Sequence, residues 1–217
     1  MRILELFCGT KSVEKAFHTM DPNHEVIIVD IEKKFKPTIL CNIMDLDYNQ
    51  WQPGHFDVVW ASPPCTYYSC MQRFSPKSKE FKQEKLKESN EIVKHTLSII
   101  DYLKPKYWFM ENPQTGTLKE QEFMKDLPWV DATYCMYGYN YRKQTRFWTN
   151  RADDVDLQIC SRSKKGKHCD SYENGRHKFA ISQTTKVMGY DVDTSKQKDR
   201  YSIPQSLLLK MFEGTVK

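Results

Sequence analysis

Short runs of consecutive hydrophobic residues alternate with amphipathic stretches over the first two-thirds of the chain. The runs have the length of strands buried on both faces, and they occupy residues 2–7, 25–30, 56–61 and 106–111. Residues 11–20 and 78–103 instead carry hydrophobic residues at helical intervals. This alternation predicts a doubly wound α/β domain with a mostly parallel sheet, whose ligands bind at the carboxyl ends of the strands.

The last third of the chain has a different pattern. Residues 130–137 and 144–150 predict strands of a returning antiparallel edge, and Pro204 is well placed at the start of a closing helix. The intervening residues are polar, basic and without clear periodicity. We therefore expect a main domain over residues 1–150, a small basic lobe over 151–201, and a helix over 202–217 that packs back on the main domain.

Composition limits the class of protein. Of the 217 residues, 39% are hydrophobic and 13% aromatic, which favours a globular fold over a disordered chain. No stretch approaches the roughly 18 uncharged apolar residues of a membrane span. A strand-like run already begins at residue 2, and the seven cysteines are an odd number. We expect no signal peptide, reduced thiols, and an intracellular protein of the nucleus or cytoplasm.

Charge is distributed unevenly along the chain. Residues 1–141 hold 17 basic and 19 acidic residues, whereas residues 142–210 hold 15 basic and 8 acidic residues. A basic third beside a near-neutral remainder is typical of a protein that binds a polyanion, although lysine-rich solvated surfaces look similar. Basic residues of the lobe are expected to contact phosphate oxygens, namely Arg162, Lys164, Lys165 and Lys167.

Two segments near the N-terminus predict half of a nucleoside-binding site. The segment "LFCGTKS" (6–12) leads from a strand through a glycine turn into a helix, so that backbone N–H groups can approach a ligand. Asp30 ends the next strand, 21 residues after Gly9, where a carboxylate can accept hydrogen bonds from ribose hydroxyls.

Two further segments place chemically reactive residues at strand ends. The segment "WASPPCTYYS" (60–69) fixes Cys65 directly after two prolines, and "WFMENPQTG" (108–116) ends a strand at Glu111. Together with "LELFCGTKS", "IVDIE", "CNIMDLD" and "YRKQTRFW", these motifs resemble, in order, those of the cytosine-C5 methyltransferases. The resemblance covers roughly residues 3–150, with a weaker similarity in "RYSIPQSLL".

This resemblance implies an enzyme that uses S-adenosylmethionine to methylate C5 of a cytosine flipped out of DNA. Cytosine C5 is a poor nucleophile, and a thiolate that adds at C6 turns the ring into an enamine whose C5 can attack a methyl group. Cys65 would supply this thiolate, and a rigid, partly exposed position with a depressed pKa suits that role. Glu111 would relieve the negative charge that builds toward N3.

The resemblance also assigns the remaining site residues. Arg146 matches the arginine that lies near the pyrimidine O2, so the catalytic set is Cys65, Glu111 and Arg146. The residues expected to bind the cofactor are Phe7, Cys8, Gly9, Asp30, Ile31, Asp45 and Pro63. Cys8 and Asp45 have an equally good interpretation as structural residues.

Three departures from the family pattern bear on these expectations. Lys11 replaces a second glycine of the cofactor loop, Trp148 replaces a second arginine, and no closing Gly-Asn-Ser-type segment is present. The last helix would have to complete the cofactor pocket, or the cofactor binds weakly. About 50 residues separate "RFWTN" from "SIPQSLL", too few for a full target-reading domain, so we expect a short recognition site or a helper protein.

Two alternatives remain open at this point. One branch of the family methylates a tRNA cytosine with the same residues. A catalytically inactive homologue that binds nucleic acid or a partner enzyme is the other, favoured by Lys11 and the missing segment and opposed by the intact Cys65 and Glu111.

The basic lobe also contains residue types that suit zinc, namely Cys160, His168, Cys169 and His177. Their spacing matches no standard zinc-binding template. We therefore expect no metal, with Cys160, Cys169 and His177 as weak candidates.

Overall fold

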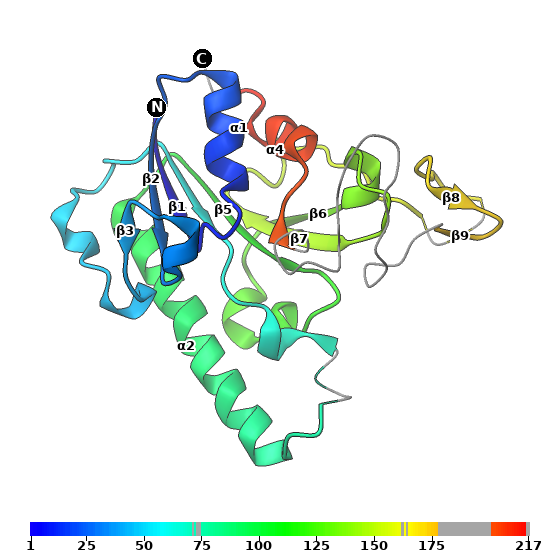
Figure 1. Cartoon of the computed structure of the whole chain (residues 1–217), viewed down its shortest axis with the longest axis horizontal. Helices are drawn as coiled ribbons and strands as arrows, with labels where there is room; N and C mark the ends of the chain where they lie inside the picture. The colour runs from blue at the N-terminus through cyan, green and yellow to red at the C-terminus, as the bar shows by residue number, and fades with distance from the viewer. Residues whose placement is uncertain (71, 73–74, 162, 164, 178–200, 216–217) are drawn as a thin grey trace.

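The computed structural model describes residues 1–70, 72, 75–161, 163, 165–177 and 201–215. Over these residues the central element is a seven-stranded sheet with the order β3-β2-β1-β4-β5-β7-β6 (Figure 1). Its strands are β1 Arg2–Leu6, β2 Glu25–Asp30, β3 Ile39–Leu40, β4 Val58–Ala61, β5 Tyr107–Pro113, β6 Trp129–Thr133 and β7 Gln144–Thr149. The first five strands are parallel, and β7 is antiparallel to both β5 and β6.

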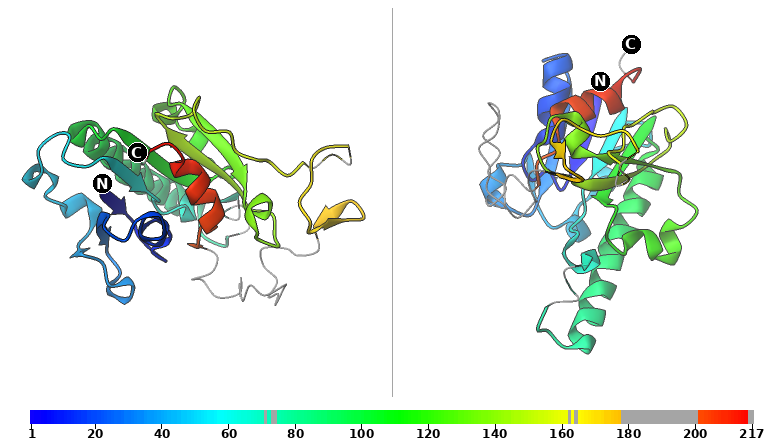
Figure 2. Two further views of the ribbon diagram at one scale, coloured as in Figure 1. Left: turned by 90° about the horizontal axis from the view of Figure 1, so that it is seen from above. Right: turned by 90° about the vertical axis from the view of Figure 1, so that its right-hand side faces the viewer.

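Helices cover both faces of this sheet, as Figure 2 shows. Helices α1 (Ser12–Met20) and α4 (Gln205–Phe212) pack on one face, and α2 (Lys79–Leu103) packs on the other. Successive residues of a strand pack into different hydrophobic cores, one on each face of the sheet. Ile3 belongs to the core on the α1–α4 side and Leu4 to the core on the α2 side, and both are fully buried. Side chains of a strand point alternately to opposite faces, so continuous apolar runs are required where both faces are covered.

Short 3₁₀ turns connect these elements. They are η1 Lys33–Phe35, η2 Ile43–Asp45, η3 Tyr48–Gln50, η4 Thr66–Tyr68, η6 Leu118–Glu120, η7 Glu122–Met124 and η8 Tyr134–Tyr137. Away from the main sheet, β8 (Tyr172–Glu173) and β9 (Arg176–His177) form a small antiparallel hairpin.

The predicted fold class is confirmed, and so is the antiparallel edge. The strand expected over 130–137 ends at Thr133 and continues as the turn η8. Strand β3 and the β8–β9 hairpin were missed, because elements of two residues leave no periodic pattern. Within the predicted lobe 151–201, residues 162, 164 and 178–200 lie outside the described part of the chain.

The C-terminal helix α4 lies against α1. The rings of Phe17 and Phe212 stack with centroids 4.3 Å apart. Ser12 Oγ accepts a hydrogen bond from the Ile203 backbone N–H at 3.1 Å, and the Gln205 side chain donates to the Ser12 carbonyl at 2.9 Å. Segments almost 200 residues apart in sequence therefore meet at the start of α1, beside the glycine turn.

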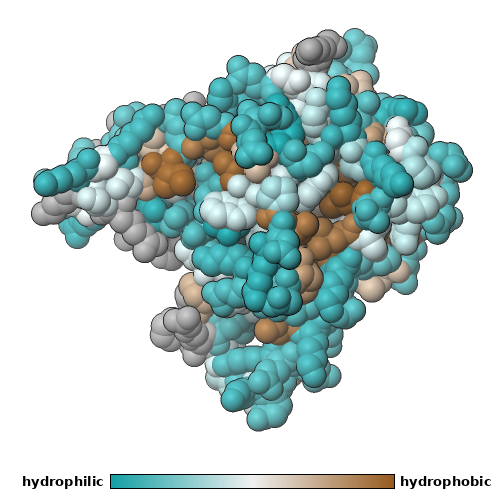
Figure 3. Space-filling view, turned by 180° about the vertical axis from the view of Figure 1, so that it is seen from behind, coloured by the Kyte–Doolittle hydropathy of each residue, from teal (hydrophilic) through white to brown (hydrophobic). Residues whose placement is uncertain are grey.

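Helix α2 begins where Ser78 accepts a hydrogen bond from the Phe81 backbone N–H at 3.2 Å. Its exposed residues are mostly charged, and the end of the molecule that projects downward in Figure 3 is hydrophilic. The same view in Figure 3 shows hydrophobic side chains in the recessed parts of the surface. Among the described residues, no helix combines the length and apolar character needed to cross a membrane.

Glu5 is the most deeply buried acid of the sheet among the described residues. Glu5 of β1 is 2% exposed, and its carboxylate accepts a hydrogen bond from the Glu14 backbone N–H at 3.0 Å. Burial raises the pKa of Glu5 to about 8, against the weaker opposing effect of backbone N–H groups at the start of α1. The folded pKa exceeds the unfolded value, so this carboxyl group stabilises the fold fully below pH 4.5 and loses that effect as the pH rises to about 8.

We therefore expect Glu5→Gln to stabilise the protein above neutral pH. The amide keeps the volume and an oxygen that can accept the Glu14 N–H, and it removes the cost of a buried charge. The gain in unfolding free energy should be on the order of 3 kcal/mol at pH 8 and small at pH 4. Urea unfolding at both pH values measures it, with the exposed Glu25→Gln as the matched control. An equal effect of Glu5→Gln at both pH values would contradict the raised pKa of Glu5.

Candidate active site

Cys65 lies on a fixed turn just beyond the carboxyl end of β4. Pro63 is buried, and Cys65 immediately precedes η4, where its carbonyl accepts the Tyr68 backbone N–H at 3.1 Å. Tyr68 is fully buried and donates from its hydroxyl to Asn90 of α2 at 2.8 Å. The turn is thereby anchored to the core while Cys65 itself stays partly exposed.

Glu111 lies near the end of the neighbouring strand β5 and is 8% exposed. Its Oε1 accepts a hydrogen bond from the Tyr134 hydroxyl at 3.3 Å and lies 3.7 Å from Lys143 Nζ. The Lys143 ammonium also lies over the Tyr134 ring, 4.6 Å from its centroid. A phenol and an ammonium group therefore hold the Glu111 carboxylate in one position.

The two motifs are joined directly. Strands β4 and β5 are parallel neighbours with Ala61 opposite Met110, so the residues that follow come to the same edge of the sheet. Asn112 Nδ2 donates to the Pro63 carbonyl at 3.0 Å, and Asn112 is 1% exposed. This buried bond fixes the turn that carries Cys65 relative to the strand that carries Glu111.

The expected depression of the Cys65 pKa is not found. The pKa of the Cys65 thiol is raised, first by burial and then by the negative charge of Glu111, and the charge of Lys143 opposes this. The reactivity of the thiol favours a low pKa, but in the folded chain the Glu111 carboxylate acts against it. Cys65 and Glu111 are close enough for the charge of one to act on the other.

Arg146 does not make the contact with Glu111 that Lys143 makes. Its guanidinium forms a two-point ion pair with Asp131 of β6, with N–O distances of 2.7 and 2.9 Å, and lies 3.4 Å from the centre of the Trp129 ring. In the β5–β7 register Arg146 is opposite Asn112, whereas Glu111 is opposite Phe147. Residues opposite each other share a face of the sheet, so Arg146 and Glu111 lie on different faces.

Sequence reasoning missed Lys143, Tyr134 and Asn112 as site residues. Lys143 is two residues from Thr145 and four from Phe147, so the alternation of the strand places it on the Glu111 face. This inference requires the register in which β7 pairs with β5, and the sequence alone does not supply that register. Trp148, which replaces the family's second arginine, is 1% exposed and belongs to the core on the α2 side.

The loop between β1 and α1 wraps around the Asp30 carboxylate. Asp30 Oδ2 accepts the Gly9 backbone N–H at 3.0 Å and the Cys8 thiol at 3.6 Å, and Oδ1 accepts the Glu32 backbone N–H at 2.8 Å. Phe7 and Gly9 both have positive φ, 59° and 44°. Burial raises the pKa of Cys8, so its thiol stays protonated and can donate to Asp30.

Lys11 also has a positive φ of 57°, and its N–H donates to the Cys8 carbonyl at 2.7 Å. A non-glycine residue in this conformation is strained by roughly 1–2 kcal/mol. Its ammonium lies 3.6 Å from the Glu14 carboxylate one turn into α1. The loop thus accommodates the bulky cation by pairing it with the helix.

Hydrophobic side chains are exposed beside Asp30, at the carboxyl ends of β2 and β3. Ile31 is 64% exposed, Leu40 51% and Met44 45%. Asp45 is exposed on the same turn as Met44, and this turn is capped where Asn42 Oδ1 accepts the Met44 N–H at 3.1 Å. An apolar surface flanked by two carboxylates can take a flat base and its ribose.

The weak metal candidates Cys160, Cys169 and His177 lie together, next to Cys135 of η8. They are not among the residues that contact Cys65 or Glu111 in the described part of the chain. Of the basic residues expected to bind phosphate, Lys165 and Lys167 are exposed, and Arg162 and Lys164 lie outside the described residues.

The fold and the two strand-end motifs define a class of protein. The strand order, with antiparallel β7 between β5 and β6, is that of the Rossmann-like α/β methyltransferases. A solved structure of Entamoeba histolytica methyltransferase EhMeth has a similar fold, with a TM-score of 0.50 and 17% identity over 80% of this chain and 57% of that one.

The sequence profile of the C-5 cytosine-specific DNA methylase family matches residues 1–145, and the chain belongs to this family. A curated relative from Frog virus 3 (isolate Goorha), named "Probable DNA (cytosine-5)-methyltransferase", is 30% identical over 98% of this chain and 99% of its own length. The Zea mays "DNA (cytosine-5)-methyltransferase 3" is 40% identical over 60 residues, 28% of this chain and 6% of that protein. The chain spans little more than half of the amoebal structure but almost the whole viral relative.

Proposed function

We propose that this protein transfers a methyl group from S-adenosylmethionine to C5 of a cytosine in DNA, through a transient bond between Cys65 and C6 of the base. The main observation behind the proposal is that Cys65 and Glu111 lie at the same edge of the sheet. A hydrogen bond from Asn112 to Pro63 links the two segments that carry them. Membership of the cytosine-C5 family and the name of the viral relative support DNA as the substrate.

The residues at the ends of β1, β2 and β3 fit the cofactor. Asp30 accepts three hydrogen bonds from the chain around it and keeps a lone pair on Oδ1 that can accept a ribose hydroxyl. Ile31 offers an exposed apolar surface for the adenine, and Asp45, exposed on η2, would accept its amino group. Phe7, Cys8, Gly9 and Pro63 would complete the pocket. When bound, the cofactor supplies the electrophilic methyl group.

Cys65 would act as the nucleophile. Its thiolate adds to C6 of the cytosine, and the electron pair of the C5–C6 double bond becomes available at C5 for the methyl group. Loss of the C5 proton to a base then expels the thiolate and restores the aromatic ring. Because Pro63 and η4 hold the turn rigidly, the sulfur is presented in one orientation, which lowers the entropic cost of the addition.

Glu111 would couple base binding to thiol activation. Its negative charge raises the Cys65 pKa in the free protein. While Glu111 keeps a proton and donates a hydrogen bond to N3 of the base, its carboxyl group is neutral and the Cys65 thiolate becomes easier to form. Cys65 would thus stay protected until a cytosine occupies the site.

A duplex hides C6 within the base stack, so the target base must be flipped out to reach Cys65. Exposed basic residues such as Lys165 and Lys167 would contact the phosphates and contribute to affinity without selecting a sequence. A short recognition site or a helper protein remains a prediction from the short lobe.

The test is methyl transfer from labelled S-adenosylmethionine to duplex DNA and, in parallel, to tRNA, followed by digestion to nucleosides and mass identification. We expect 5-methyldeoxycytidine from DNA. Label found only as 5-methylcytidine in tRNA would overturn DNA as the substrate, and methylation of an amino group would overturn the covalent route. Absence of cofactor binding by calorimetry would instead indicate an inactive homologue.

Lys143 gives a more specific prediction. Its charge lowers the Cys65 pKa, so Lys143→Met should raise that pKa and reduce the thiolate fraction at neutral pH. We expect slower alkylation of Cys65 by iodoacetamide at pH 7.5 and a rate profile displaced to higher pH, read by peptide mass spectrometry. The exposed Lys125→Met is the control. An unchanged profile would show that Lys143 does not act on the thiol.

A further inference from the structure

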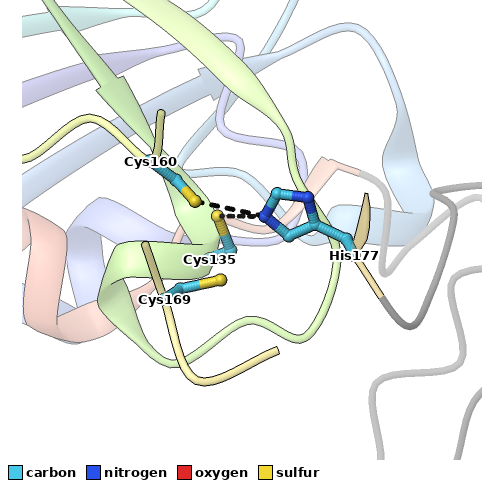
Figure 4. Close-up of side chains that lie close together, drawn as sticks. All are labelled: Cys135, Cys160, Cys169 and His177. Atoms are coloured by element: carbon cyan, nitrogen blue, oxygen red, sulfur yellow. Dashed lines mark hydrogen bonds between the residues drawn. The ribbon is translucent and has the colours of Figure 1, made fainter. Parts of the chain in front are cut away.

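Four side chains that bind metals converge away from the candidate active site. Cys135 belongs to η8, Cys160 to the segment after β7, Cys169 to the turn before β8, and His177 to β9. Their ligand atoms all lie within 4.8 Å of one another, and Figure 4 shows the three thiols and the imidazole pointing toward a common centre. His177 Nε2 is 3.2 Å from Cys160 Sγ and 3.5 Å from Cys135 Sγ. The three cysteines are at most 9% exposed.

The first half of the cluster is fixed to the main sheet. The Cys160 N–H donates to Thr133 Oγ1 of β6 at 2.6 Å. The Cys160 carbonyl accepts two hydrogen bonds from the Arg142 guanidinium, at 3.3 and 3.2 Å. Cys135 follows Thr133 by two residues, so both thiols are held by the same strand end.

The second half is brought back by the β8–β9 hairpin. Asn174 and Gly175 have φ of 51° and 85°, which is the conformation of a two-residue hairpin turn that Asn-Gly favours. The pairing places Tyr172 opposite His177, and the Tyr172 N–H donates to the Cys169 carbonyl at 3.0 Å. His177 is thereby returned to the side of Cys169.

The pairing within this hairpin contributes little stability by itself. Two paired residues on each strand are too few for a stable isolated hairpin. The local core consists of the three cysteines, with partly buried Met136 and Tyr172 against them. Thiols therefore occupy the positions where such a small lobe needs a hydrophobic core or a cross-link.

The residue types of these four ligands favour zinc as the bound metal. Three cysteines and one histidine form a standard four-ligand structural zinc site. Bond lengths in such sites give Sγ–Nε2 separations of about 3.6 Å and Sγ–Sγ separations of about 3.8 Å around a tetrahedral ion. The distances from His177 Nε2 to Cys160 Sγ and Cys135 Sγ are close to the first value. A disulfide would use two thiols and leave the third thiol and the imidazole without a role.

We propose that Cys135, Cys160, Cys169 and His177 bind one structural zinc ion that fastens the β8–β9 hairpin to the end of β6. Four protein ligands leave no open position, so the ion is structural and takes no part in methyl transfer. Three thiolates and Zn²⁺ carry one net negative charge, and the Arg142 guanidinium beside Cys160 offsets it. The site revises the sequence-based expectation of no metal. Cys135, 25 residues before Cys160, was the ligand that spacing could not reveal.

His168 is not one of the four ligands. Its ring stacks on Tyr172 with centroids 3.7 Å apart and planes parallel within 1°. Tyr172 in turn meets the His177 ring edge-on at 5.3 Å. His168 would thus hold the aromatic side chain that positions the ligating histidine.

The test is the metal content of the untagged full-length protein, purified without chelator and measured by inductively coupled plasma mass spectrometry. We expect about one zinc per chain. Cys169→Ser and His177→Ala should lower this to below about 0.1, whereas His177→Cys should retain the ion through four thiolates. Cys70→Ser, which removes an exposed thiol outside the cluster, should leave the zinc content unchanged.

A second measurement on the wild-type protein does not depend on the variants being folded. Removal of zinc with a chelator should make residues 165–177 sensitive to limited proteolysis and leave the main sheet resistant, and added Zn²⁺ should restore protection. Stoichiometric iron instead of zinc, the absence of bound metal, full zinc in Cys169→Ser, or a disulfide among these cysteines would each overturn the proposal. None of these measurements uses methyl transfer, so they test the zinc site independently of the proposed function.

Discussion

Cys65→Ala is expected to abolish methyl transfer, with a loss of at least about 10³-fold, because no other group can form the bond to C6. The same variant should lose covalent trapping on DNA that contains 5-fluorocytosine. Fluorine at C5 cannot leave as a proton does, so the wild-type protein stays bonded to the base after methylation. The measurement is a shifted band on a denaturing gel, with the modified peptide identified by mass spectrometry.

The control for this experiment is Cys70→Ala. Cys70 is exposed and lies five residues further along the same segment, so its removal changes the thiol count but not the site. It should keep both activity and trapping. A covalent adduct that persists in Cys65→Ala would falsify the assignment of the nucleophile.

Glu111→Gln should have the second-largest effect, a fall in kcat of about 10²–10⁴-fold, since the amide cannot transfer a proton to N3. The same change removes the negative charge that raises the Cys65 pKa. Cys65 should therefore react with iodoacetamide at lower pH than in the wild-type protein. A thiol that becomes more reactive while the enzyme becomes slower distinguishes loss of a catalytic acid from simple misfolding.

The exposed Glu120→Gln, on the neighbouring turn η6, serves as the matched variant and should alter neither kcat nor thiol reactivity. Affinity for S-adenosylmethionine should be the same in Glu111→Gln and the wild-type protein, because the predicted cofactor residues other than Pro63 lie at or after the ends of β1, β2 and β3 and not on β5. Retention of full activity in Glu111→Gln would remove this residue from the mechanism.

Much of the fold was predictable from local patterns. The apolar runs at 25–30 and 106–111 are fully formed strands, and the amphipathic stretch at 78–103 is α2 almost to the residue. Each of these elements buries one or both of its faces in the core, so the pattern of hydrophobic residues along it is strong. The hairpin at 172–177 was missed because its stability comes from contacts outside itself.

The site was only partly predictable. Cys65 and Glu111 come to one edge because β4 and β5 are parallel neighbours, a consequence of the alternating pattern. Arg146 was expected near the pyrimidine O2, and the β5–β7 register places it opposite Asn112 and in an ion pair with Asp131. A change of register by one residue exchanges the faces, and no local pattern in "YRKQTRFW" specifies that register.

The fold class, the order of the motifs and the edge of the sheet where they meet follow from the amino-acid sequence, because hydrophobic periodicity and turn residues act locally. Three features became visible only in the folded chain: Lys143 faces Glu111, burial and a neighbouring carboxylate raise the Cys65 pKa, and Cys135 joins Cys160, Cys169 and His177. These features depend on register, burial and the approach of residues distant along the chain, and such quantities exist only once the chain is packed.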